Sequence, residues 1–201
     1  MAPDTELVKA VVKVGDGRGF IIEADDRHLV ITAAHCLPHF PPCYGASATK
    51  DRTYRDLIGP LGESAPKVSA ECLFADPVGD IAVLGSPNNQ ALYDEAIVFE
   101  TLTNETPTLR IGEAENESPA WLLTLDGRWT RCAIQHVGGW PLWIENAEEP
   151  ILGGMSGSPI LNGDADAIGV VCLGGGSDLD ITSTGGPNPR LTHSLPGWVL
   201  L

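Results

Sequence analysis

The sequence predicts an all-β protein built from two small β units, and three observations support this fold class. Short β-rich runs recur along the whole chain, separated by glycine and proline, which account for 23 and 16 of its 201 residues. Apolar residues spaced at i, i+3, i+4 and i+7 persist nowhere over three helical turns. Many short strands without helical crossovers favour a barrel or a sandwich over a parallel sheet.

The predicted strands fall into two sets, one on either side of a polar stretch, and turn residues separate the strands within each set. The first set is Leu7–Val14, Phe20–Glu23, Leu29–Thr32, Cys72–Phe74, Ile81–Leu84 and Ile97–Phe99. The second set is Leu109–Ile111, Trp121–Leu125, Arg131–Val137, Leu142–Glu145, Pro159–Leu161 and Ala167–Leu173. The polar stretch Glu100–Pro107 is interpreted as a linker, which predicts domains at residues 1–104 and 105–201. The last segment, Asn188–Leu201, predicts a short C-terminal helix that Pro196 interrupts.

The charge balance argues against a nucleic-acid partner. The chain has 27 acidic and 12 basic residues, a net charge of −15, and its lysines and arginines are scattered. A phosphate-binding surface needs them clustered. The acidity instead favours solubility in a salty cytosol or, as a second interpretation, attraction of a basic substrate or partner. No run of about 18 apolar residues predicts a membrane span.

The cysteines indicate a reducing compartment. They are odd in number, widely spaced and free of CxxC pairs, namely Cys36, Cys43, Cys72, Cys132 and Cys172. The N-terminal segment lacks the basic and long apolar regions of a secretory signal. We therefore expect reduced thiols in a cytoplasmic protein. Cys36, His39 and Cys43 lie near one another, but their spacing does not match a structural zinc site, so neither metal nor cofactor is expected.

Three short segments carry the residue types of nucleophilic catalysis: TAAHC (Thr32–Cys36), GDIAVL (Gly79–Leu84) and GGMSGSPI (Gly153–Ile160). Each segment alone is weak evidence, because histidines after strands and aspartates in turns are common. Together they supply a base in His35, a carboxylate in Asp80 and a nucleophile in Ser156. A serine hydroxyl attacks only when an imidazole takes its proton, and a carboxylate must orient that imidazole. The glycines around Ser156 allow a tight turn, in which the amides of Gly154 and Ser156 are predicted to form an oxyanion hole.

These motifs resemble those of the trypsin/chymotrypsin-like serine peptidases, most closely the bacterial trypsin-like and HtrA-type peptidase domains. The resemblance covers nearly the whole chain and includes the order His35, Asp80, Ser156. GRGFIIE (Gly17–Glu23) is similar to the family's Gly-x-Gly-Phe strand. AIGVVCLGGG (Ala167–Gly176) is similar to the strand whose edge pairs with the substrate backbone.

The resemblance implies a chymotrypsin-like fold of two packed six-stranded antiparallel β-barrels, with His35 and Asp80 on the first and Ser156 on the second. It implies a serine endopeptidase that cuts protein or peptide substrates through an acyl-enzyme. Two departures matter. The strand that would pair with Cys36 has no cysteine, so the family's disulfide there is not expected. Met155 replaces the aspartate that captures a new N-terminus, so activation by N-terminal cleavage is not expected.

The same comparison addresses specificity. Pro150 stands where trypsin has its pocket aspartate, so a preference for Arg or Lys does not carry over. The residues expected to bind substrate are Ile151, Leu152, Cys172, Leu173 and Gly174. They favour a pocket for a small or medium apolar side chain. A carboxylate for a basic side chain stays open as an alternative, supplied by Glu148, Glu149, Asp178 or Asp180.

Two other functions stay open at this point. One is a catalytically silent or latent fold that binds peptides along the Cys172–Gly174 edge by strand addition. The other is hydrolysis of a small ester or amide, which uses the same nucleophile. For a peptidase free in the cytosol, we also expect narrow specificity or a protein partner that activates or restrains it.

Overall fold

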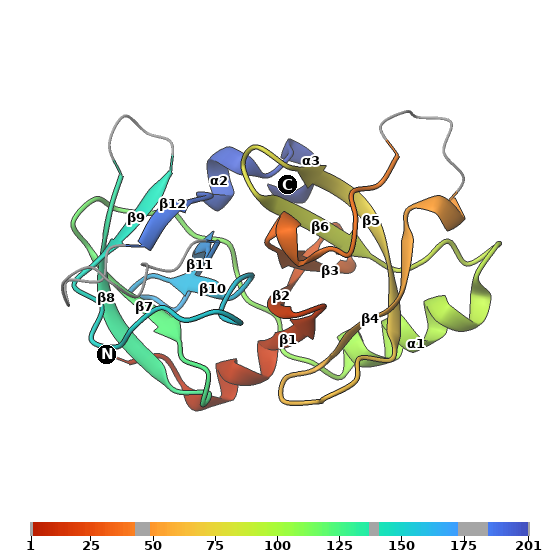
Figure 1. Ribbon diagram of the computed structural model, residues 1–201, viewed down its shortest axis with the longest axis horizontal. Coiled ribbons are helices and arrows are strands. Elements are labelled where there is room, and N and C mark those ends of the chain that lie inside the picture. The colour runs from red at the N-terminus through yellow and green to blue at the C-terminus, as the bar shows by residue number, and fades with distance from the viewer. Residues whose placement is uncertain (1, 43–48, 137–140, 173–184, 201) are drawn as a thin grey trace.

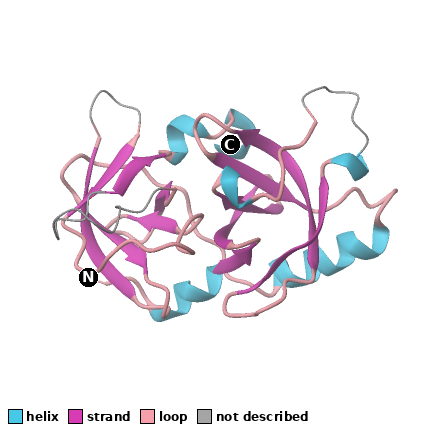
Figure 2. Cartoon of the chain, in the orientation of Figure 1, coloured by secondary structure: helices cyan, strands magenta, loops and turns pink. Residues whose placement is uncertain are grey.

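The computed structural model describes residues 2–42, 49–136, 141–172 and 185–200. Two antiparallel β units of six strands each lie side by side, with a few short helices at their margins (Figures 1 and 2). The predicted all-β class, with its two six-stranded units, is confirmed.

The first unit is a closed barrel with the strand order β1-β2-β3-β6-β5-β4. Its strands are β1 (Val11–Val14), β2 (Gly17–Ala24), β3 (Arg27–Thr32), β4 (Thr53–Pro60), β5 (Val68–Asp76) and β6 (Ile81–Gly85). Side chains such as Phe20, Ile31 and Leu84 are wholly buried in its core. The pairing of β3 with β6 brings together the ends of two strands that the sequence separates widely.

The second unit is a half-barrel, a six-stranded sheet with the order β11-β10-β7-β8-β9-β12. Its strands are β7 (Pro119–Leu123), β8 (Trp129–Gln135), β9 (Leu142–Glu145), β10 (Pro159–Leu161), β11 (Ala167–Val170) and β12 (Gly185–Asn188). Buried Leu122, Ile134, Ile144 and Ile160 form its separate apolar core.

Both ends of the chain cross from one unit to the other. The N-terminal 3-10 helix η1 (Thr5–Ala10) leads into β1, yet the Asp4 carbonyl just before it accepts a hydrogen bond from the Trp129 indole of β8, at 3.3 Å. The C-terminal helices α2 (Leu191–Ser194) and α3 (Gly197–Leu200) follow β12 (Figure 1). Helix α3 packs against β2 of the first unit. Helices α2 and α3 confirm the predicted C-terminal helix and its interruption near Pro196.

A helix, α1 (Tyr93–Asn104), replaces the predicted strand Ile97–Phe99 and the first half of the predicted linker. Its buried side chains, Ala96, Phe99 and Thr103, lie on one face, which packs against β5. Ile97 and Val98 on the opposite side are about half exposed. These two exposed apolar residues obscure the helical period, which is why the strand interpretation was wrong.

The structure also corrects several strand predictions. The first half of Leu7–Val14 is the 3-10 helix η1, and Leu109–Ile111 forms only isolated bridges. Strands β4 and β12 were not predicted. A register shift between Tyr54 and Ile58 breaks the alternation in β4, and β12 reads GGPN, which resembles a turn. None of the described helices is long and apolar enough to span a membrane.

Candidate active site

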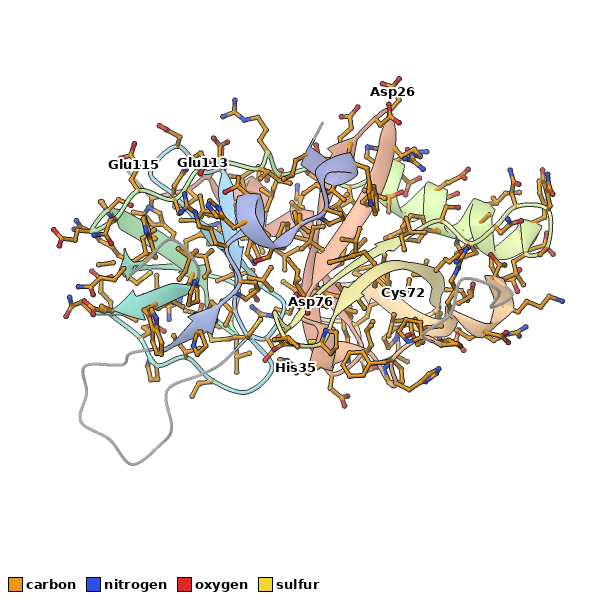
Figure 3. The ribbon with its side chains drawn as sticks, turned by 90° about the horizontal axis from the view of Figure 1, so that it is seen from above. Asp26, His35, Cys72, Asp76, Glu113 and Glu115 are labelled. Carbon is orange, nitrogen blue, oxygen red and sulfur yellow. The ribbon has the colours of Figure 1, made fainter. Side chains whose placement is uncertain are left out.

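The first barrel places His35 beside Asp80. His35 lies in the 3-10 helix η2 (Ala34–Cys36) just after β3, and Asp80 directly precedes β6. Because Thr32 of β3 pairs with Ala82 of β6, the two strand ends meet. The His35 Nδ1 atom lies 2.7 Å from one Asp80 carboxylate oxygen, and the His35 amide donates to the other at 2.9 Å. Figure 3 shows His35 near the middle of the molecule, between the two units.

These two contacts fix the orientation of the imidazole. A carboxylate accepts hydrogen bonds, so its partner nitrogen, Nδ1, carries the proton. The opposite nitrogen, Nε2, is then left with the lone pair that a general base needs. The His35 side chain is about half exposed.

The turn that carries Asp80 is conformationally constrained. Asp80 has φ +54°, a left-handed conformation that is uncommon for a residue other than glycine. The Asp76 carboxylate accepts a hydrogen bond from the Val78 amide at 2.9 Å and lies so close to Gly79 that a side chain there would collide with it. The turn therefore holds a strained backbone at the point where the carboxylate meets the imidazole.

Ser156 lies in a glycine-rich turn that leads into β10, and both units hold this turn. Its carbonyl accepts a hydrogen bond from the Arg18 amide of β2, at 2.7 Å. The next residue, Gly157, donates to the Val171 carbonyl at 2.7 Å. Gly157 has φ +84°, and a Cβ there would lie 1.7 Å from the Arg18 carbonyl oxygen. Only glycine fits at this close approach of the two units.

The predicted oxyanion hole is compatible with this turn. Gly154 has φ +91°, which a residue with a side chain rarely adopts. Within the described residues, neither the Gly154 nor the Ser156 amide donates a hydrogen bond to another protein group. The Ser156 hydroxyl likewise has no hydrogen-bond partner there. Catalytic hydrogen bonds are often long before substrate binds, so an unformed His35–Ser156 contact is compatible with a resting site.

The residues predicted to bind substrate have different environments. Ile151 is buried in the core of the second unit, whereas Leu152 is half exposed. Cys172 is buried, and its amide donates to the Asn188 side chain at 2.8 Å. Leu173 and Gly174 lie outside the described residues, as do Asp178 and Asp180. Of the alternative acidic residues, Glu149 pairs with Arg128 at 3.0 Å.

Arg18 is a residue that sequence reasoning missed. It is only 5% exposed, and its guanidinium donates to the carbonyls of Leu123 and Thr124, both at 3.0 Å, and of Leu125 at 3.2 Å. Burial lowers the pKa of Arg18 from its ordinary value. The available signal was an arginine at the start of a mainly apolar strand, but GRGFIIE was interpreted only for its similarity to the Gly-x-Gly-Phe strand of the family.

The four described cysteines, Cys36, Cys72, Cys132 and Cys172, are buried and form no disulfide. Burial raises the pKa of Cys36 and of Cys72 to about 11, so both thiols are protonated near neutral pH. Cys43 lies outside the described residues. No group of three or more His, Cys, Asp or Glu side chains in the described part of the chain is arranged to hold a metal ion.

Comparison with known proteins identifies similar sequences and folds. Residues 17–170 match the model of the trypsin-like peptidase domain family. The crystal structure of Rv3671c protease in an inactive form is 18% identical, with a TM-score of 0.55, covering 96% of this chain and 93% of that one. An inactive mutant of Rv3671c, from M. tuberculosis H37Rv, gives the same identity and TM-score, with 92% and 83% covered.

The apo protease domain of MamO from Magnetospirillum magneticum is 15% identical, with a TM-score of 0.51, covering 90% of this chain and 93% of that one. At these identities the likeness shows the fold, and it confirms the expected chymotrypsin-like architecture. A search of curated proteins finds no match.

Proposed function

Because the chain belongs to the trypsin-like peptidase domain family, we propose that it is a serine endopeptidase that hydrolyses protein substrates through an acyl-enzyme on Ser156. The observation that carries this proposal is the pair of contacts by which Asp80 holds both the ring and the backbone of His35. A carboxylate placed in this way fixes the tautomer and stabilises the imidazolium that forms when the base accepts a proton.

The reaction follows from these roles. Ser156 Oγ attacks the scissile carbonyl while His35 Nε2 takes its proton, and the amides of Gly154 and Ser156 stabilise the resulting oxyanion. His35 then gives the proton to the leaving amine as the C–N bond breaks, which leaves an ester on Ser156. Water attacks this ester with His35 again as the base. The acid product leaves, and the Ser156 hydroxyl regains its proton.

The environment of Cys172 supports substrate binding by strand addition. The Cys172 amide donates to the Asn188 side chain, so the proposed pairing uses the Cys172 carbonyl, which would accept a hydrogen bond from a substrate amide. The segment lies directly after β11, beside the turn that carries Ser156. We propose that the acyl side of an extended peptide pairs along Cys172–Gly174. For the side chain next to the scissile bond, we propose a small or medium apolar residue.

We further propose that the protein acts in the cytoplasm and that narrow specificity or a protein partner limits its activity. The buried thiols support the first proposal, because reduced cysteines are usual in that compartment. Broad and rapid cleavage of casein by the isolated protein would contradict the second.

Cleavage of a library of proteome-derived peptides, with new termini identified by mass spectrometry, tests the proposed function. Wild type should generate new termini, and Ser156→Ala should generate none. Turnover of small esters without peptide cleavage would indicate the small-ester hydrolase instead. Peptides that bind equally to both proteins without being cut would indicate a silent binding module.

A further inference from the structure

The strand order of the second unit places the Ser156 turn between two flanking segments. Strand β10, which the turn enters, pairs on one side with β11 and on the other with β7. Both neighbours are antiparallel to β10, so their last residues lie beside its first residue. The continuation of β11, ending at Cys172, therefore lies on one flank of Ser156. The continuation of β7, Thr124–Leu125, lies on the other.

Leu125 offers an apolar surface on the second flank. Its side chain is 49% exposed. Its Cδ2 atom lies 3.5 Å from the position that a Cβ on Gly154 would occupy, which is ordinary van der Waals distance. The amide of Gly154 is one of the two assigned to the oxyanion hole. An exposed leucine side chain thus lies next to a residue of the proposed reaction site.

Arg18 fixes the position of this leucine. Its guanidinium binds the carbonyls of Leu123, Thr124 and Leu125, while its own amide binds the Ser156 carbonyl. A single residue of the first barrel therefore holds both the turn of the nucleophile and the segment of Leu125. Among the described residues no carboxylate pairs with this buried cation, and three of the four hydrogen bonds of its guanidinium go to that one segment.

The hairpin between β7 and β8 is short, which limits the movement of Leu125 further. The Thr124 amide donates to the Arg128 carbonyl at 2.9 Å, and the Gly127 amide donates to the Thr124 carbonyl at 3.1 Å. The Thr124 hydroxyl closes the same turn through the Arg128 carbonyl at 2.8 Å. Leu125 is held in place before any substrate arrives.

We propose that Leu125, positioned by Arg18, forms the subsite on the leaving-group side of the scissile bond and selects an apolar residue there. The proposal rests on the proposed function, because it assigns the acyl side to the Cys172 flank and so leaves the Leu125 flank for the departing half. A substrate side chain covering Leu125 would remove its exposed apolar surface from water. Arg18 acts as a positioning residue, and Leu125 as a specificity-determining one.

Competition for the acyl-enzyme tests the proposal. An activated ester first acylates Ser156, and its alcohol departs, which leaves the leaving-group side of the acyl-enzyme open. Dipeptide amides (Leu-Gly, Gly-Leu and Gly-Gly amides) then compete with water. The amine attacks the acyl carbonyl, the Ser156–acyl bond breaks, and His35 passes the amine's proton to Ser156. The ratio of peptide products is independent of the rate at which the acyl-enzyme forms.

Wild type should favour one leucine-containing amide over Gly-Gly amide by about tenfold, the scale of discrimination that an apolar contact supplies. Leu125→Ser and Arg18→Met should lower this ratio toward one. Leu200→Ser and Arg110→Met are the controls and should keep the wild-type ratio, because both side chains are at least partly exposed. Among the described residues, neither makes a hydrogen bond or ion pair with the β7–β8 hairpin or the Ser156 turn. An unchanged ratio in folded Leu125→Ser would overturn the proposal. A product ratio that falls toward one in either control variant would overturn it as well.

A second measurement separates this proposal from the proposed function. If the ester does not acylate the protein, the peptidase assignment fails. The subsite is then tested on Ser156→Ala by NMR titration with three peptides that carry leucine at the first, at the second or at neither position after the central bond. Tighter binding of one leucine peptide, lost in the double variant with Leu125→Ser, supports the subsite. Equal binding of all three peptides overturns it.

Discussion

The thiol of Cys172 donates a hydrogen bond to the backbone carbonyl of Asp80, with an Sγ–O distance of 3.1 Å. This bond joins the strand that we propose binds substrate to the turn that orients His35, and it crosses from the second unit to the first. Burial raises the pKa of Cys172, so the thiol keeps the proton that it donates. One buried thiol thereby joins the proposed substrate-binding segment to the backbone of Asp80.

The effect of a Cys172 substitution on kcat/KM should depend on whether the new side chain can donate a hydrogen bond to the Asp80 carbonyl. Cys172→Ala removes the hydrogen bond to a strained residue, and we expect kcat/KM to fall by about three- to tenfold. Cys172→Ser keeps a hydroxyl donor and should retain more activity than the alanine variant. Hydrolysis of an activated ester measures both. Equal rates for the two variants would show that the bond does not support catalysis.

Asp80→Asn should lower kcat by about 10⁴-fold, because an amide in place of the carboxylate favours the wrong tautomer of His35. Asp76→Asn is the matched control. An asparagine oxygen still accepts from the Val78 amide, so the turn keeps its hydrogen bond. Steady-state kinetics on the same ester compare the two. A similar loss in both variants would mean that Asp80 supports only the fold of the turn.

Gly157→Ala should destabilise the protein by at least about 3 kcal/mol, through steric conflict and a strained left-handed backbone. Its Cβ would collide with the Arg18 carbonyl oxygen. Gly163→Ala is the control, since nothing lies within 4 Å of a Cβ at that position. Urea unfolding of both variants gives the difference in free energy. A Gly157→Ala protein as stable as the control would contradict the described contact between the units.

The buried thiols predict that stability declines in alkaline solution. Burial raises the pKa of Cys36 and Cys72 from 9.0 to about 11 and that of Cys132 to about 12. Above pH 9 the unfolded chain therefore releases protons that the folded chain keeps. The free energy of unfolding should fall as the pH rises from about 9 to about 11, and these thiols contribute no pH dependence well below 9.

Urea unfolding at pH 8, 9.5 and 10.5 measures this decline. Cys132→Ala should reduce the slope between the last two values, because it removes one of the titrating groups. A free energy of unfolding that stays level or increases from pH 9.5 to 10.5 would show that these thiols are not buried as described.

Some parts of this structure follow from local sequence and others do not. The contact between His35 and Asp80 follows from a short-range pattern, because each residue lies where a turn meets an apolar strand. Helix α1 was missed because Ile97 and Val98 are apolar but exposed. The position of Arg18 depends on the packing of one unit against the other, which no local pattern encodes.

The most direct test of Ser156 as the nucleophile is the intact mass of the protein after incubation with a fluorophosphonate, which forms a stable adduct with an activated serine. We predict a single adduct on wild type, formed without prior removal of N-terminal residues, and none on Ser156→Ala. Such an adduct requires both a base and an oxyanion hole in working order. No adduct on folded wild type, or an adduct that persists in Ser156→Ala, would contradict the assignment of Ser156 as the nucleophile.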